Sequence, residues 1–167
     1  MSSEVYVVMG VSGSGKSLIG RALADALGLT FVEGDAYHPP ENVERMSRGI
    51  PLTDADRAGW LRALAARIRD AGIKGEGLVV TCSALKRSYR DILRAESESL
   101  RFVFLRGSRD LIAERLAGRR GHFMPPTLLD SQIATLEEPL PDEGALVFDV
   151  SGSPQDIVAA LVARARA

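Results

Sequence analysis

Several residue types are scarce in this 167-residue sequence, and each scarcity excludes a class of protein. A single cysteine, Cys82, excludes an internal disulfide framework and is typical of proteins in a reducing compartment. Because 21 basic residues are balanced by 22 acidic ones, the chain lacks the excess positive charge that holds nucleic acid. No apolar run approaches the roughly 20 residues that a membrane-spanning helix needs. The composition therefore predicts a cytoplasmic protein with neither a nucleic-acid nor a membrane partner.

Short segments rich in β-branched and aromatic residues predict five β-strands, at 5–9, 30–33, 78–82, 101–105 and 145–150. Most are apolar almost throughout, which is typical of parallel strands that are covered on both faces. Helical patterns alternate with them, at 16–27, 55–71, 87–95, 109–117, 127–136 and 154–166. This alternation predicts one α/β domain over 1–167, a three-layer α/β/α sandwich with a five-stranded parallel sheet. Ligands of such folds bind at the carboxyl ends of the strands.

Two segments fit neither pattern. One is 34–52, which contains Pro39, Pro40 and Pro51, and the other is 118–126, which contains two glycines and two prolines. Each follows an element that ends at the predicted ligand edge, and long loops in a compact domain are usually functional. We interpret the first as the start of a substrate-binding insertion at about 36–76 and the second as a mobile lid.

The segment 10–17 reads GVSGSGKS and matches the phosphate-binding pattern G-x-x-x-x-G-K-[ST] at every fixed position, between a predicted strand and a predicted helix. We call it the phosphate loop. Its glycines let main-chain N–H groups point at phosphate oxygens, Lys16 reaches the outer phosphates of ATP, and Ser17 offers its hydroxyl to Mg²⁺. The predicted nucleotide-binding residues are Gly10, Ser12, Gly13, Ser14, Gly15, Lys16 and Ser17. The pattern does not identify the acceptor, because motors, switches and kinases share it.

The position of a carboxylate separates these classes. The third predicted strand is followed by Ser83 and Ala84 and lacks the Asp-x-x-Gly of GTP switches, and no Asn-Lys-x-Asp guanine reader is present. Asp35 instead follows the second strand, where it can accept a hydroxyl proton from an acceptor and contact Mg²⁺. The alternative is that Asp35 only initiates a turn. The sequence thus favours a kinase, with Lys16 and Asp35 as catalytic candidates.

Basic residues of the predicted lid are further candidates. Arg119 and Arg120 lie at 118–126 together with His122. Guanidinium groups there can close over the triphosphate and neutralise the transferring phosphoryl group, which makes Arg120 a third catalytic candidate. The alternative is a solvated arginine pair at a helix end.

Longer segments carry a family resemblance: MGVSGSGKS at 9–17, GDAYHP at 34–39, NVERM at 42–46, PLTDADRAGWL at 51–61, CSALKRSYRD at 82–91 and GHFM at 121–124. In order and spacing they resemble gluconate kinase, of the shikimate-kinase-like P-loop family, over nearly the whole chain. The resemblance implies Mg²⁺-dependent transfer of the ATP γ-phosphate to the 6-hydroxyl of D-gluconate by a homodimer. Another small-metabolite kinase of this fold and a non-catalytic nucleotide-binding regulator remain as alternatives.

The resemblance also implies site residues. It places Arg119 and 151–154 around adenine, and Ser17 and Asp35 at the metal. The implied substrate-binding residues are Asp35, His38, Arg57, Ser83, Lys86, Arg90 and His122. A surface ion pair with Asp54 is the alternative for Arg57, and a solvated basic helix face is the alternative for Lys86 and Arg90. Glu33 stands where relatives often carry aspartate, and we assign it no role.

Overall fold

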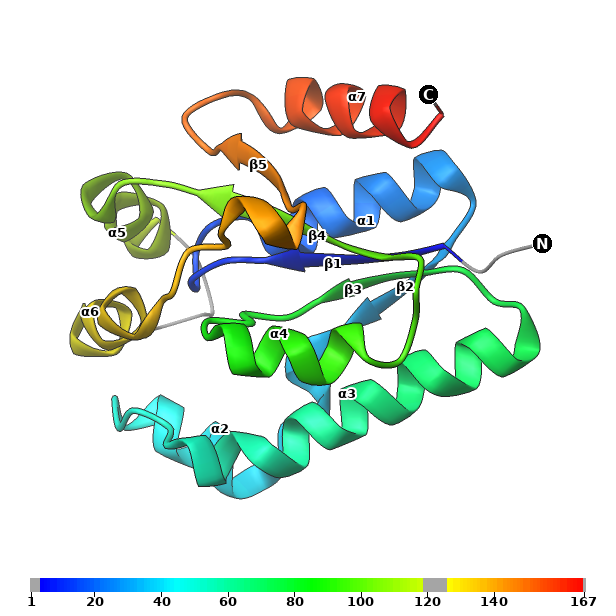
Figure 1. Cartoon of the computed structure of the whole chain (residues 1–167). Coiled ribbons are helices and arrows are strands. Elements are labelled where there is room, and N and C mark those ends of the chain that lie inside the picture. Colours follow the sequence, from blue (N-terminus) through cyan, green and yellow to red (C-terminus); the bar gives the residue numbers. More distant parts are fainter. Residues whose placement is uncertain (1–3, 119–125, 167) are drawn as a thin grey trace.

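The computed structural model describes residues 4–118 and 126–166, and it shows a three-layer α/β/α sandwich (Figure 1). All strand pairs are parallel, and the five strands lie in the order β2-β3-β1-β4-β5. Their bounds are β1 Val5–Met9, β2 Thr30–Glu33, β3 Leu78–Thr81, β4 Leu100–Arg106 and β5 Leu146–Asp149. Helices α1 and α7 cover one face of the sheet and α3 and α4 cover the other. The predicted fold class is confirmed.

The helices begin close to the predicted positions. Their bounds are α1 Lys16–Leu27, α2 Pro40–Ser47, α3 Asp54–Lys74, α4 Arg87–Arg94, α5 Arg109–Ala117, α6 Pro126–Thr135 and α7 Pro154–Ala165, with 3₁₀ turns η1 Gly34–Tyr37 and η2 Pro141–Glu143. A capping box between Thr53 and Asp56 starts α3, as its sequence indicates. That helix continues past Gly72 and ends at Gly75, whose φ of 71° is favourable for glycine. Within the described residues no helix is long and apolar enough to cross a membrane.

The segment 34–52 differs from the prediction of a loop, because it contains η1 and α2. The three prolines of this segment predict irregular structure there. In the structure Pro39 is the N-cap of α2 and Pro40 is its first residue. A proline at that position costs no hydrogen bond, since the first N–H groups of a helix have no partner inside it.

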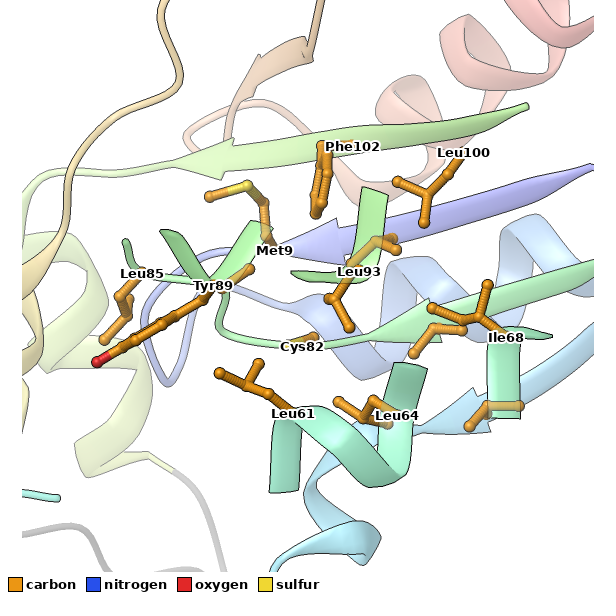
Figure 2. Close-up of a cluster of buried hydrophobic side chains, with 14 of the residues drawn as sticks. Met9, Leu61, Leu64, Ile68, Cys82, Leu85, Tyr89, Leu93, Leu100 and Phe102 are labelled. Carbon is orange, nitrogen blue, oxygen red and sulfur yellow. The ribbon is translucent and has the colours of Figure 1, made fainter. Parts of the chain in front are cut away.

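Side chains from both faces of the sheet form the core. Figure 2 shows the cluster on the α3 and α4 side, to which Leu64 of α3, Leu93 of α4 and Phe102 of β4 belong. Cys82 lies in this cluster, only 1% exposed, and burial raises the pKa of its thiol to about 12. It is therefore a core residue and not a nucleophile. The packed sheet holds the carboxyl ends of β1, β2 and β3 next to one another, and the predicted site residues follow those ends.

Candidate active site

The phosphate loop leaves β1 at Gly10 and enters α1 at Lys16. Gly13 and Gly15 have φ values of 84° and 96°, which let the backbone curl between the strand and the helix. Lys16 Nζ donates to Gly10 O at 3.1 Å and Val11 O at 3.0 Å, so the ammonium group is held against the loop. Ser14 Oγ is sealed from solvent without a hydrogen-bond partner in the described part of the chain. An orphaned hydroxyl in this loop fits a site that a phosphate group completes.

Glu33, to which we assigned no role, lies directly beside the phosphate loop. Ser17 Oγ donates to Glu33 Oε2 at 2.6 Å, and Thr81 Oγ1 donates to Glu33 Oε1 at 2.6 Å. The Gly34 N–H in turn donates to Thr81 Oγ1 at 3.0 Å. Gly34 is required at this point, because a Cβ atom there would lie 1.8 Å from Thr81 O. Close approach of β2 to β3 thus fixes a carboxylate next to the hydroxyl that we predicted to bind Mg²⁺.

One cleft of about 280 Å³ joins the phosphate loop to the predicted acceptor residues. Its polar lining contains four of those acceptor residues, Asp35, His38, Arg57 and Ser83, together with Lys16 and Ser12 of the phosphate loop and with Ser47 and Gln132. Its apolar lining consists of Val43 and Met46 from α2, and Leu52, Leu116 and Leu128. The size and mixed lining suit a small polar metabolite.

The His38 ring is held on two sides. It stacks on Trp60 with ring centroids 4.1 Å apart, and Asn42 Nδ2 lies 3.2 Å from His38 Nδ1. The same Asn42 nitrogen donates to Asp56 O at 2.8 Å. Burial is the main cause that lowers the pKa of His38 below its ordinary 6.5. The charge of Asp35 raises this pKa and the charge of Arg57 lowers it, both by less than burial does. The ring is therefore neutral at pH 7, and Nδ1 accepts the hydrogen bond from Asn42.

The predicted alternative for Arg57, an ion pair with Asp54, does not form. Arg57 is 8% exposed, and its Nη1 donates to the hydroxyl of Tyr89 at 3.2 Å. Asp54 is instead bonded by Lys86 Nζ at 3.0 Å and by the Tyr89 hydroxyl. Lys86 lies outside the lining of the cleft, and its hydrogen bond to Asp54 raises its pKa. The structure thus brings Arg57 to the cleft and pairs Lys86 on the surface.

Arg90 is not brought to the cleft, in contrast to the prediction. Its side chain is fully buried, and Nε and Nη2 donate to the two carboxylate oxygens of Glu143 at 2.7 and 3.0 Å. Nη1 donates to Ala84 O at 2.8 Å. Ala84 has a φ of 45°, an unusual value for a residue other than glycine. Arg90 therefore supports the turn that carries Ser83, and its guanidinium has no open side toward a substrate.

A second cleft lies on the other side of the phosphate loop. It is lined by Gly13, Ser14, Gly15, Leu18, Ile19, Arg115, Val150, Gly152, Pro154 and Ile157. It includes part of the predicted 151–154 segment, and Arg115 Nη2 donates to Val150 O there at 2.5 Å. The predicted site residues Arg119, Arg120 and His122 lie outside the described residues.

Sequence reasoning missed several residues of the site. Gln132 lines the first cleft, and Arg115 lines the second. Asn42 and Trp60 hold His38. No local motif marks Gln132, because its contact with the phosphate loop joins residues 120 positions apart. Glu33 was detectable, since it ends a strand beside Asp35.

Comparison with known proteins identifies the family. Residues 12–165 match the family model described as shikimate kinase. A gluconokinase of Gluconobacter oxydans is 53% identical over 91% of this chain and 84% of its own length, and the thermosensitive gluconokinase of Escherichia coli is 46% identical over 88% and 79%. The crystal structure of a gluconokinase from Sinorhizobium meliloti superposes with a TM-score of 0.86 at 52% identity, covering 93% of this chain and 87% of that one. This chain therefore belongs to the shikimate kinase family of P-loop kinases and, within it, groups with the gluconokinases.

Proposed function

We propose that this kinase transfers the γ-phosphate of ATP to the 6-hydroxyl of D-gluconate, giving 6-phospho-D-gluconate and ADP. The observation that carries the proposal is the single cleft in which Lys16 of the phosphate loop meets Asp35, His38 and Arg57. The similarity to gluconokinases supports gluconate as the acceptor.

Residues of the phosphate loop would hold the triphosphate of ATP. Its N–H groups, the positive end of α1 and Lys16 together match the charge of the β- and γ-phosphates. The second cleft is the candidate position of the adenosine, with Arg115 and Pro154 on its walls. In this proposal Arg119 and Arg120 close over the phosphates as part of a lid at 118–126, and 36–76 forms the acceptor-binding segment.

Mg²⁺ would be held by Ser17 and Asp35, with Glu33 as a neighbour that orients the Ser17 hydroxyl at 2.6 Å. When bound, Mg²⁺ neutralises phosphate charge and orients the triphosphate. The described residues contain no group of three or more metal-binding side chains that would hold a metal alone. This agrees with an ion that takes only one or two protein carboxylates and binds mainly through phosphate oxygens.

Asp35 is our candidate for the base. As the acceptor oxygen attacks the γ-phosphorus, its proton passes to the Asp35 carboxylate, the new O–P bond forms, and the bond to the β,γ-bridging oxygen breaks. ADP leaves with the negative charge, which Lys16 neutralises. Catalysis then rests on positioning and charge compensation, as is usual for phosphoryl transfer.

The acceptor pocket matches a small hydroxy acid. The described residues place no carboxylate in an ion pair with Arg57, so its charge can meet the carboxylate of gluconate. His38 and Ser83 would contact hydroxyl groups, as would His122 from the lid. Lys86 and Arg90, which the structure pairs elsewhere, contribute indirectly in this proposal. The proposal also includes that the protein is a homodimer and acts in the cytoplasm.

An ADP-release assay with Mg·ATP tests the proposal against gluconate, shikimate and a panel of sugar acids. We expect turnover with gluconate and background rates with shikimate. If only a different acceptor is turned over, gluconate is not the substrate, but the protein is still a kinase. Nucleotide binding without turnover on any acceptor would favour the regulator.

A further inference from the structure

Gln132 connects α6 to the phosphate loop. The Ser12 N–H donates to Gln132 Oε1 at 2.8 Å, across 120 residues of sequence. Gln132 is only 8% exposed, so its side chain is held inside the site. Because a main-chain N–H can only donate, the amide oxygen must face Ser12 and the amide nitrogen must face elsewhere. The loop contact therefore fixes the orientation of the Gln132 amide.

The amide nitrogen of Gln132 has two N–H donors, and neither is used in the contact with Ser12. The described residues offer Nε2 no hydrogen-bond partner, and Nε2 is not sealed from solvent, since Ser14 Oγ is the one described side-chain atom that is both sealed and unpartnered. Gln132 lines the same cleft as Lys16 and Asp35. Water can accept from this donor while the cleft is empty, and a ligand that displaces the water has to supply an acceptor in its place. Nε2 is thus an open donor in the candidate active site.

Two groups could accept a hydrogen bond from Nε2 in this cleft: the substrate that receives the phosphate, or the phosphoryl group in transfer. Ser12 belongs to the phosphate loop, and Lys16 Nζ is held at the adjacent Gly10 and Val11 carbonyl groups. The residues predicted to bind the substrate lie on elements other than the phosphate loop: His38 follows β2 and η1, and Arg57 lies in α3. The amide is therefore anchored at the phosphate loop, the part of the cleft where the γ-phosphate of ATP would lie in the proposed function.

We propose that Gln132 Nε2 donates a hydrogen bond to the phosphoryl group in transfer, while Oε1 holds the phosphate loop. This inference rests on the proposed ATP-dependent function but not on the identity of the acceptor. The competing interpretation is that Gln132 only supports the loop through Ser12.

Gln132→Glu separates the two interpretations. Glutamate keeps an oxygen that accepts the Ser12 N–H but replaces the NH₂ donor with a negatively charged oxygen facing the phosphoryl group. We expect kcat to fall about 10²-fold, the usual effect of removing one donor to developing negative charge. The matched control is Gln155→Glu, which makes the same change at an exposed position in the first turn of α7 and should leave kcat within about 2-fold.

Nucleotide binding provides a readout that needs no acceptor. Calorimetry with ADP and with a non-hydrolysable ATP analogue, both with Mg²⁺, measures how strongly each variant prefers the nucleotide with a γ-phosphoryl group. Gln132→Glu should lose at least ~10-fold of that preference, since a hydrogen bond to a charged group is of this strength, and keep its ADP affinity. An unchanged preference in this variant would overturn the proposal and leave a loop-supporting role.

A second variant covers the case in which Gln132→Glu does not fold. Gln132→Met has similar length with neither donor nor acceptor, and it should also lose the preference for the analogue. Equal loss of affinity for ADP and for the analogue in Gln132→Met would contradict the proposal. If the wild type binds the analogue and turns over no gluconate, the acceptor assignment fails while this test remains valid.

Discussion

Ser17 Oγ and Glu33 Oε2 lie 2.6 Å apart and are joined by a hydrogen bond from the hydroxyl to the carboxylate. The other Glu33 oxygen accepts from Thr81 of the neighbouring strand, so the carboxylate is fixed by β2 and β3 together. A negatively charged group therefore stands beside the residue that we expect to bind Mg²⁺. Substitution of a residue that orients a metal ligand typically lowers metal affinity about 10- to 100-fold.

Glu33→Gln should raise the Mg²⁺ concentration needed for half-maximal activity about 10-fold, because it removes the charge but keeps a similar shape. Titration of Mg²⁺ at saturating ATP measures this, and Mg²⁺-dependent ADP binding gives a readout without turnover. Glu33→Asp keeps the charge and should lie closer to the wild type. The same Mg²⁺ dependence in all three proteins would show that Glu33 acts only in holding β2 to β3.

Asp35→Asn should lower kcat at least 10²-fold while the fold persists, because a base acts in the transition state. Lys16→Ala should lower kcat by at least the same factor through loss of charge compensation. Single-turnover kinetics with circular dichroism on each variant measure these effects. Asp25→Asn, an exposed change in α1, is the control. A folded Asp35→Asn protein with wild-type turnover would remove Asp35 from the mechanism.

The sheet, the phosphate loop and most helix positions were predictable, because they depend on local patterns. Continuous apolar strands and the glycine-rich motif are readable within a few residues. The end of α3 shows the limit of this approach. Gly72 is unfavourable inside a helix by about 1 kcal/mol, but the fully buried Ala71 next to it packs in the core and the helix continues to Gly75.

From local patterns, site residues were predictable where spacing along the chain brings them to the same strand ends, whereas Arg57 in α3 was implied only by the family resemblance. Asp35, His38 and Ser83 follow such ends and do line the cleft. Arg90 follows the same strand as Ser83, yet its partner Glu143 is 53 residues away, and no spacing rule could have shown that this carboxylate would turn the guanidinium into the core. Tertiary contacts of this kind decide whether a charged side chain serves a site or the fold.

The neutral state of His38 has a consequence for pH dependence. Its pKa lies below 6.5 because burial disfavours the imidazolium, and protonation would also set an Nδ1–H donor against the Asn42 donor. The KM for gluconate should therefore be constant from about pH 7 to 8.5 and should rise only as the pH falls below the ordinary value of 6.5. His38→Gln should show a higher KM without this acidic rise. The His38 ring signal in NMR gives its midpoint directly, and a midpoint above 6.5 would contradict the prediction.

The buried pair of Arg90 and Glu143 should control stability in acid. Both side chains are 1% exposed, and hydrogen bonds from Arg90, assisted by Arg94, lower the pKa of Glu143 from 4.5 to about 2. Since the folded state holds this carboxylate ionised, its contribution is complete above the ordinary 4.5 and is lost as the pH falls toward 2. A shift of this size corresponds to roughly 3 kcal/mol.

Glu143→Gln should lower the free energy of unfolding by about 3–5 kcal/mol at pH 7, because it leaves the Arg90 charge buried without a carboxylate. Urea unfolding measures this, and the difference from the wild type should shrink steadily between pH 5 and pH 3 as the wild-type carboxylate loses its advantage. Glu138→Gln breaks an exposed pair with Arg106 and should cost less than about 1 kcal/mol. A Glu143→Gln effect as small as that of Glu138→Gln, or one that does not change with pH, would show that the turn at Ala84 is held by packing and not by this ion pair.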